Sequence, residues 1–363
     1  MPWRVFWPKL LGKMRSHGRN QYLRAVSRIK KPAWSGKRRL LFALKKSLRQ
    51  EFPNGLKVAF PFWPIGSMQE LRSLIIKEFP DHGKDIIRQA EQYLAGEYQI
   101  LEAQPRNLKS LSQELAQGSG FPSTYLPWHF DWTQPSRWDP RSTYLDCALY
   151  GFDGVDAKFP WELSRFAHLV TLAQACCLTQ EERYLEEITR QLEDWHQHNP
   201  PGYGINWACA MDVGIRAANV LFAIGLLSEQ LTRHPNQARR IHSLLPSFVF
   251  NHAAHILKNL EAPTNHLLGD LTGLVFLAEF YPHFASSQQW GRLAREELIR
   301  QMQFQVYPDG MNFESSTSYH RLVTEFFLTA WLIWRSHPRV LPQSFIQRLR
   351  KMTKAIDVYT KAT

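Results

Sequence analysis

Cysteines, long apolar runs and phosphate-binding motifs are scarce or missing in this sequence. Its four cysteines, Cys147, Cys176, Cys177 and Cys209, show no CxxC spacing, which argues against a disulfide framework. No stretch approaches the ~18 apolar residues of a membrane-spanning helix, so no membrane span is expected. The sequence also lacks a Gly-rich phosphate loop, a Walker motif and a serine nucleophile elbow, which argues against the enzyme classes built on them.

Acidic residues are outnumbered by basic ones, and the imbalance is greatest near the N-terminus. The sequence holds 44 Lys and Arg against 32 Asp and Glu, a formal net charge of +12, and such a surplus attracts polyanions. Residues 1–50 carry a basic run and the remainder is closer to neutral, so no nucleic-acid partner is expected. We expect a basic N-terminal arm over residues 1–55 and one folded domain over residues 56–363.

Apolar residues recur with helical spacing along most of the chain. From residue 159 onward Leu163, Phe166 and Val170 begin a series at steps of three and four, as one face of an α-helix requires. An earlier helix is expected over residues 67–95. Because the region from 159 shows no period-two alternation, we expect an all-α fold with almost no sheet.

Two sets of expected helix starts alternate along the sequence. One set begins near residues 160, 207, 265 and 318, the other near residues 181, 239, 288 and 342. Starts of one set recur every 47 to 58 residues, the differences between those numbers. Such a period indicates a solenoid or an incomplete α/α toroid of helix hairpins. The first set opens with polar and aromatic residues, so we expect an inner ring whose N-terminal ends meet at one mouth.

The candidate site residues come from these four inner starts. They are Trp161, Glu162 and Arg165; Trp207, Asp212 and Arg216; Asn265 and His266; and Tyr319 and His320, with Glu314 just before the last pair. Each has an ordinary structural alternative. The two tryptophans either stack on sugars or pack in the core, and the two arginines either grip carboxylate or sulfate groups or form salt bridges. For Arg216 the alternative is an i, i+4 pair with Asp212. The two glutamates are expected to orient their neighbours.

Asn265 and Tyr319 are the strongest candidates for chemistry. Asn265 either caps a helix, which is worth ~1 kcal/mol, or donates its amide to a substrate carboxylate. Tyr319 is either a core tyrosine or a proton-transferring group. Because the two lie 54 residues apart, one repeat, both are expected to reach the same mouth.

Metal and cofactor signals are weak. His252 and His255 lie at i and i+3 on one helix face, but no thiol or acidic residue completes a site beside them in the sequence. We interpret the pair as coincidental and expect neither a metal nor a cofactor.

Four sequence segments together resemble the heparinase II/III family of polysaccharide lyases. They are KFPWELSRFAHL, NPPGYGINWACAMDVGIRAAN, TNHLLGDLTGLVFLAEFYPHF and QVYPDGMNFESSTSYH, within residues 158–334. The resemblance implies an incomplete α/α toroid followed by a C-terminal β-sandwich. It also implies catalytic roles for Asn265 and Tyr319, which match the NH and SxxYH motifs, and a further catalytic His from the sandwich. No candidate sandwich precedes Thr363, so this chain is expected to supply only the toroid half of the site.

The resemblance and the residues point to the same chemistry. Cleavage of an acidic polysaccharide by β-elimination removes the C5 proton of a uronate, which requires neutralisation of its carboxylate and a general acid/base. Asn265 suits the first task and Tyr319 the second, with His266, His320 and Arg216 as neighbours that lower the pKa of the tyrosine. A non-catalytic glycan-binding module and a toroid glycoside hydrolase, which needs two carboxylates, remain alternatives.

The sequence gives two conflicting indications of where the protein is located. The first residues, MPWRVFWPKLL, are too short and too interrupted for the apolar core of a signal peptide. The chain as it stands is therefore expected to be cytoplasmic, whereas the family resemblance implies the periplasm.

Overall fold

The computed structural model describes residues 67–101, 103–117, 123–133, 136–149, 155–282, 286–335 and 341–360. The arm predicted over residues 1–55 lies outside them. The helices are α3 (Met68–Glu78), α4 (Pro80–Ala95), α5 (Leu108–Ala116), α6 (Lys158–Ser164), α7 (Ala167–Thr179), α8 (Glu182–His198), the 3₁₀ helix η1 (Ile205–Trp207), α9 (Ala210–Leu226), α10 (Ser228–Arg233), α11 (Pro235–Lys258), α12 (Asn265–Phe280), α13 (Ser287–Gln305), α14 (Thr317–Trp334) and α15 (Gln343–Tyr359). The strands are β1 (Glu97–Tyr98), β2 (Arg106–Asn107), β3 (Phe130–Asp131) and β4 (Ser136–Arg137).

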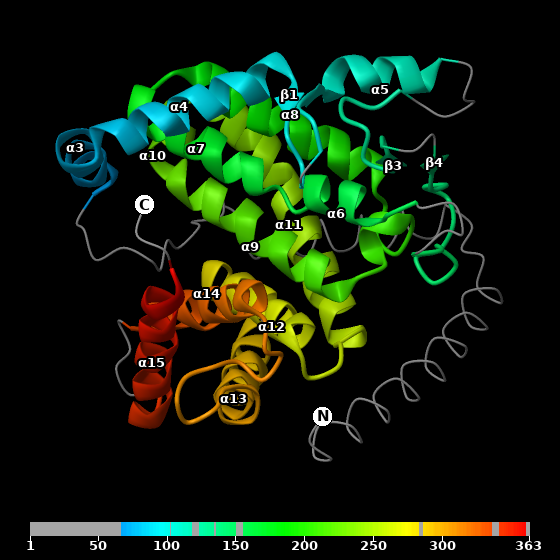
Figure 1. The fold of residues 1–363 in the computed structure, drawn as a ribbon. Coiled ribbons are helices and arrows are strands. Elements are labelled where there is room, and N and C mark those ends of the chain that lie inside the picture. Colours follow the sequence, from blue (N-terminus) through cyan, green and yellow to red (C-terminus); the bar gives the residue numbers. More distant parts are fainter. Residues whose placement is uncertain are drawn as a thin grey trace.

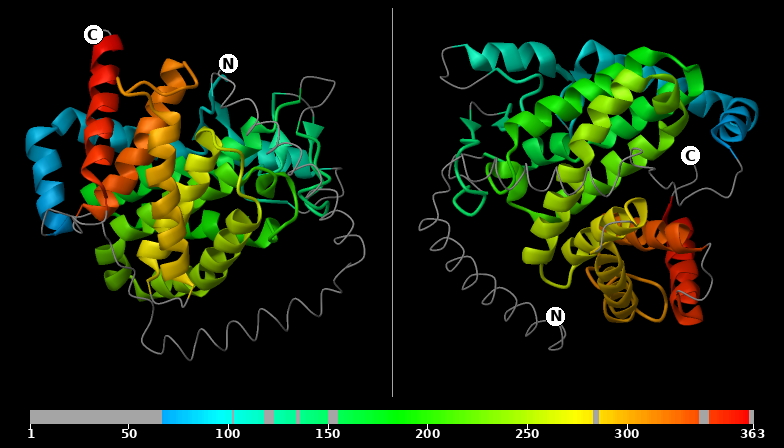
Figure 2. Two further views of the ribbon diagram at one scale, coloured as in Figure 1. Left: turned by 90° about the horizontal axis from the view of Figure 1, so that it is seen from below. Right: turned by 180° about the vertical axis from the view of Figure 1, so that it is seen from behind.

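The helices form hairpins arranged around a partly closed ring. The inner helices α7, α9, α12 and α14 contact one another in that order, and each packs against the next outer helix, α8, α11, α13 or α15. Figure 1 and both views of Figure 2 show the hairpins of α12 to α15 beside those of α7 to α11. The strands form only two short antiparallel pairs, β1–β2 and β3–β4. The prediction of an all-α, incomplete toroid is confirmed.

Most predicted helix starts agree with the structure, and two predicted helices are each broken in two. α12 begins at Asn265 as predicted, and the other inner and outer starts differ by a few residues. The helix expected over 67–95 is interrupted at Phe79, because the following Pro80 disfavours helical backbone before it. The apolar series from residue 159 is interrupted at Phe166, whose φ of 60° is left-handed. Its ring is fully buried, so packing holds this unfavourable backbone conformation.

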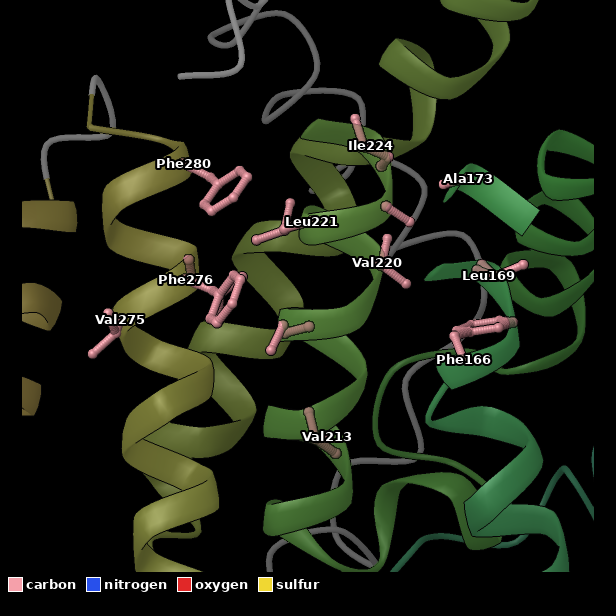
Figure 3. Packing of buried hydrophobic residues seen from close by; sticks show 14 of the residues in the cluster. Phe166, Leu169, Ala173, Val213, Val220, Leu221, Ile224, Val275, Phe276 and Phe280 are labelled. Carbon is pink, nitrogen blue, oxygen red and sulfur yellow. The ribbon is translucent and has the colours of Figure 1, made fainter. Parts of the chain in front are cut away.

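The core lies between the inner helices. α9 and α12 are buried at almost every position, as expected for helices that are apolar on all sides. Figure 3 shows Phe276 and Phe280 of α12 directed toward α9, where Leu221 and Ile224 lie. Among the helices that the structure describes, none is long and apolar enough to cross a membrane.

Glycines permit the close approach of α9 and α12. A Cβ atom built on Gly273 would lie 2.4 Å from the Cα atom of Gly214, and one built on Gly214 would lie 2.4 Å from the carbonyl oxygen of Gly269. Both neighbours are backbone atoms, which cannot rotate away as a side chain can. The distance between the two central helices therefore depends on these glycines.

We expect Gly273→Ala to lower the free energy of unfolding by about 3 kcal/mol, because the added methyl group forces the two helices apart. Chemical denaturation measures this loss. Gly83→Ala is the matched control: Gly83 is also buried in a helix, but its added Cβ would meet its nearest neighbour at an ordinary 3.6 Å. The control should leave stability unchanged or raise it by about 0.5–1 kcal/mol. Equal stability of the two variants would contradict this account of the crossing.

Candidate active site

Asn265 is the first residue of α12, and its side chain is held by a carboxylate. Its backbone N–H donates to Glu314 Oε1 at 2.9 Å, and its Nδ2 donates to Glu314 Oε2 at 2.7 Å. The side chain is 6% exposed. The cap of α12 is Thr264, whose hydroxyl accepts the N–H of His266. The structural alternative for Asn265, that it caps the helix, is therefore wrong.

Tyr319 lies in the first turn of the neighbouring inner helix, α14. The hydroxyl of Ser316 caps this helix by accepting the Tyr319 N–H at 3.3 Å. The Tyr319 side chain is 49% exposed, so it is not a core tyrosine. Glu314, five residues earlier, joins the segment before α14 to the start of α12. The segment before one inner helix and the first turn of the next are thus connected through one carboxylate.

His266 belongs to a second cluster at the same end of α12. Its Nδ1 lies 2.9 Å from Glu261 Oε2 and 3.9 Å from Cys209 Sγ, and Cys209 is the residue before α9. The hydrogen bond with Glu261 raises the pKa of His266 above its ordinary value. The imidazole therefore carries positive charge over a wider pH range than usual, next to Asn265.

Arg165 connects the first inner start to the second. Its Nε donates to Asp212 Oδ1 at 2.5 Å, and its guanidinium also pairs with Glu162. Burial by itself would lower the pKa of Arg165, but these two carboxylates raise it above the ordinary value. Asp212 thus pairs with Arg165 across two helices. The i, i+4 alternative, in which Asp212 pairs with Arg216, is not found among the described residues. Glu162 orients its neighbour as expected.

Arg216 and Trp207 are part of the core, which corrects their prediction as substrate-binding residues. Each is 1% exposed. Both terminal nitrogens of Arg216 donate to the carbonyl of Asn206, at 2.6 and 3.1 Å, and its guanidinium lies over the rings of Trp195 and Trp207. Burial lowers the pKa of Arg216 to about 9. Neither side chain can reach a substrate in this arrangement.

His320 is also buried, although it follows the exposed Tyr319. It is fully inaccessible, its Nδ1 accepts the N–H of Asn312 at 3.1 Å, and its Nε2 lies 3.1 Å from the carbonyl oxygen of Met352. His320, a candidate site residue by sequence, is therefore closed off from a substrate, and it fastens the turn before α14 to α15. Trp161 is partly exposed, and its indole N–H donates to the carbonyl of Ile205 at 2.9 Å.

The imidazole rings of His252 and His255 pack against aromatic rings. The His252 ring stacks on Phe248 at a centroid distance of 3.8 Å, and His255 packs edge-on against Trp207 at 5.1 Å. Sequence reasoning did not single out Cys209 or Glu261, which lie beside His266 in the structure. The position of Glu261, five residues before His266, was a local signal for this cluster.

The end of α6 and the starts of α9, α12 and α14 are therefore linked to one another through polar side chains. Pairs that are distant in sequence join them: Arg165 with Asp212, Cys209 with His266, and Asn265 with Glu314. A buried amide and a partly exposed imidazole lie among these side chains, and the exposed Tyr319 stands in the first turn of α14. Such a set can bind an anion at a helix N-terminus and transfer protons.

Known proteins match the chain over this same region. The family model described as Heparinase II/III N-terminus matches residues 87–361. Heparin-sulfate lyases of Bacteroides stercoris and Pedobacter heparinus are 27% and 26% identical over 218 and 214 residues. These matches cover 54% and 55% of this chain but 32% and 31% of the relatives. The chain thus spans about a third of the length of the curated relatives it matches.

Solved structures agree on the fold. A heparinase III structure superposes with a TM-score of 0.53 at 19% identity, covering 86% of this chain and 46% of that one. A heparan sulfate lyase of Pedobacter heparinus gives a TM-score of 0.50 at 19% identity, covering 87% and 43%. At such identities the likeness concerns the fold alone. Because the family model matches most of the chain, over the helices that carry the polar region, this chain belongs to the heparinase II/III family.

Proposed function

We propose that this chain supplies the helical part of a polysaccharide lyase site, which cleaves uronate-containing acidic glycans by β-elimination. The observation that carries the proposal is Asn265, whose backbone N–H and side-chain amide both donate to Glu314, beside the helix that bears the exposed Tyr319. Membership of the family and the names of the heparin-sulfate lyases support it. Heparan sulfate is therefore the first substrate to test.

Asn265 would neutralise the uronate carboxylate. Its Nδ2 carries two hydrogens, and Glu314 accepts one of them. The other hydrogen would donate to an incoming carboxylate oxygen. Elimination places negative charge on that carboxylate as the C5 proton departs, so a donor fixed beforehand stabilises the transition state more than the ground state.

The charges around Asn265 determine whether an anion can bind there. Glu314 by itself would repel a substrate carboxylate. The positive end of α12 and the imidazole of His266, whose pKa is raised, both oppose that repulsion. Glu314 is thus the residue that orients the amide, and the helix terminus and His266 supply the attraction.

Tyr319 would carry the proton. As the phenolate it accepts the C5 proton, the C4–O4 bond breaks as the C4=C5 double bond forms, and the phenol then donates the proton to the departing oxygen. One group can act in both steps because the proton it takes is the proton it returns. Arg165 would not contact the substrate itself, because its guanidinium is engaged by Asp212 and Glu162.

The carboxylates of this region do not favour the hydrolase alternative. Glycoside hydrolysis requires two carboxylates facing one bond. Glu162 and Asp212 both pair with Arg165, and Glu314 holds Asn265. Each of the three therefore already has a partner that fixes it.

Incubation with heparan sulfate tests the proposal. Elimination yields new reducing ends together with the ultraviolet absorbance of an unsaturated uronate, hydrolysis yields reducing ends alone, and a binding module yields neither. We expect the chain alone to bind the glycan with little turnover, and turnover to rise when the β-sandwich of a heparinase is fused after Thr363. Reducing ends without absorbance would refute the lyase proposal. Rapid elimination by the chain alone would show that the helical part suffices.

A further inference from the structure

Three side chains from two inner helix starts surround one point beside Asn265. The Cys209 sulfur lies 3.8 Å from Glu261 Oε2 and 3.9 Å from His266 Nδ1, and those two atoms are 2.9 Å apart. Cys209 is buried, whereas Glu261 and His266 are partly exposed. A sulfur, a carboxylate oxygen and an imidazole nitrogen thus converge at a place that solvent can reach.

We propose that Cys209, Glu261 and His266 bind a divalent transition-metal ion, with zinc as the best fit. Bond lengths of about 2.3 Å to sulfur and 2.0–2.1 Å to nitrogen or oxygen at a tetrahedral angle place sulfur about 3.6 Å from the other two ligands, and these about 3.4 Å from each other. The observed separations differ from those values by about 0.5 Å or less. Small side-chain rotations therefore suffice to form the site.

Asp212 provides a separate observation in favour of a cation. It is 2% exposed, and among the residues that the structure describes its Oδ2 has no donor stronger than the neighbouring Cys209 thiol. A buried carboxylate oxygen with so weak a partner is costly. The Asp212 charge acts on both Cys209 and His266. A metal ion between those residues would offset this excess of negative charge.

The chemistry of the donors selects the ion. Thiolate and imidazole ligands favour zinc and its transition-metal relatives, whereas calcium and magnesium prefer sites made of oxygen alone. Binding would replace the Cys209 thiol proton, which burial otherwise retains by raising the thiol pKa well above its ordinary value. Sequence reasoning considered His252 and His255 with His266 nearby, but it did not connect His266 to Cys209, because Cys209 lies 52 residues before Glu261 and 57 before His266.

This inference does not rest on the proposed lyase function, although the ion would add positive charge next to Asn265. Its test therefore uses no glycan. The chain is freed of metal with a chelator and titrated with Co²⁺, and the thiolate-to-cobalt charge-transfer absorbance is recorded. We expect this absorbance to saturate at one Co²⁺ per chain and to disappear when Zn²⁺ is added. A chain that develops no such absorbance would overturn the proposal.

Variants assign the site to these ligands. Cys209→Ala should abolish the charge-transfer absorbance, and Glu261→Gln and His266→Gln should each weaken Zn²⁺ binding by at least about 100-fold. Cys176→Ala is the matched control, because Cys176 is equally buried and lies in α7. It should bind as the unchanged chain does. Circular dichroism confirms that each variant is folded. Absorbance that survives Cys209→Ala in a folded protein would also overturn the proposal.

Discussion

Tyr319→Phe should reduce turnover of heparan sulfate by about 10²–10⁴-fold, the contribution typical of a general acid–base group. The substitution removes only the hydroxyl that carries the proton. Because the aromatic ring remains, glycan affinity should change by less than about threefold. Initial rates of ultraviolet absorbance, measured in the fusion with a heparinase β-sandwich, give the first quantity. Calorimetric titration gives the second.

Tyr307→Phe is the matched control for this loss. Tyr307 is 45% exposed, close to the 49% of Tyr319, and lies in the segment between α13 and α14. Its substitution removes an equally accessible hydroxyl of the same kind outside the first turn of α14, so turnover should be unchanged. Equal turnover of Tyr319→Phe and the control would remove Tyr319 from the mechanism.

Asn265→Ala should lower turnover by about 10²–10³-fold, the effect expected when one preorganised donor to a developing anion is lost. The variant also leaves the Glu314 carboxylate without the amide it accepts from. Substrate affinity should therefore fall as well, because an unpaired carboxylate then repels the uronate. Steady-state rates over a range of glycan concentrations measure both effects.

Thr264→Ala separates helix capping from catalysis. Thr264 is the cap of α12, so its loss should lower the free energy of unfolding by about 1 kcal/mol while turnover per folded molecule stays near that of the unchanged protein. Asn265→Ala should show the reverse, with most of its effect on turnover. If the two variants lose turnover equally, the residues at the start of α12 have a structural role and no catalytic one.

The parts of the fold that depend on residues close together in the sequence could be predicted. The spacing of apolar residues located the helices, and the alternation of their starts predicted the paired arrangement. The start of α12 at Asn265 was predicted correctly, because Pro263 and the polar residues after it form a strong local signal. The breaks at Phe79 and Phe166 were missed. Apolar periodicity continues across a break when the residues on both sides pack against the same core.

Which side chains are buried at the inner helix starts could not be predicted from local sequence patterns. Arg216 and His320 looked like substrate-binding residues because they are polar and stand near Trp207 and Tyr319. Both are almost completely buried, and backbone carbonyls and aromatic rings from other segments engage them. Which face of a helix is covered depends on segments far away in sequence, so a single helix pattern does not reveal it.

The sequence alone determined the helical class and the repeat, because these follow from local spacing, and recognisable motifs singled out Asn265 and Tyr319 as candidates. Only the tertiary structure decided which groups those residues meet. Glu314 reaches Asn265 across 49 positions, and Cys209 approaches His266 across 57. The physical reason is the close packing of inner helices that start about one repeat apart. It brings their polar first turns together, and no local pattern specifies which side chains then make contact.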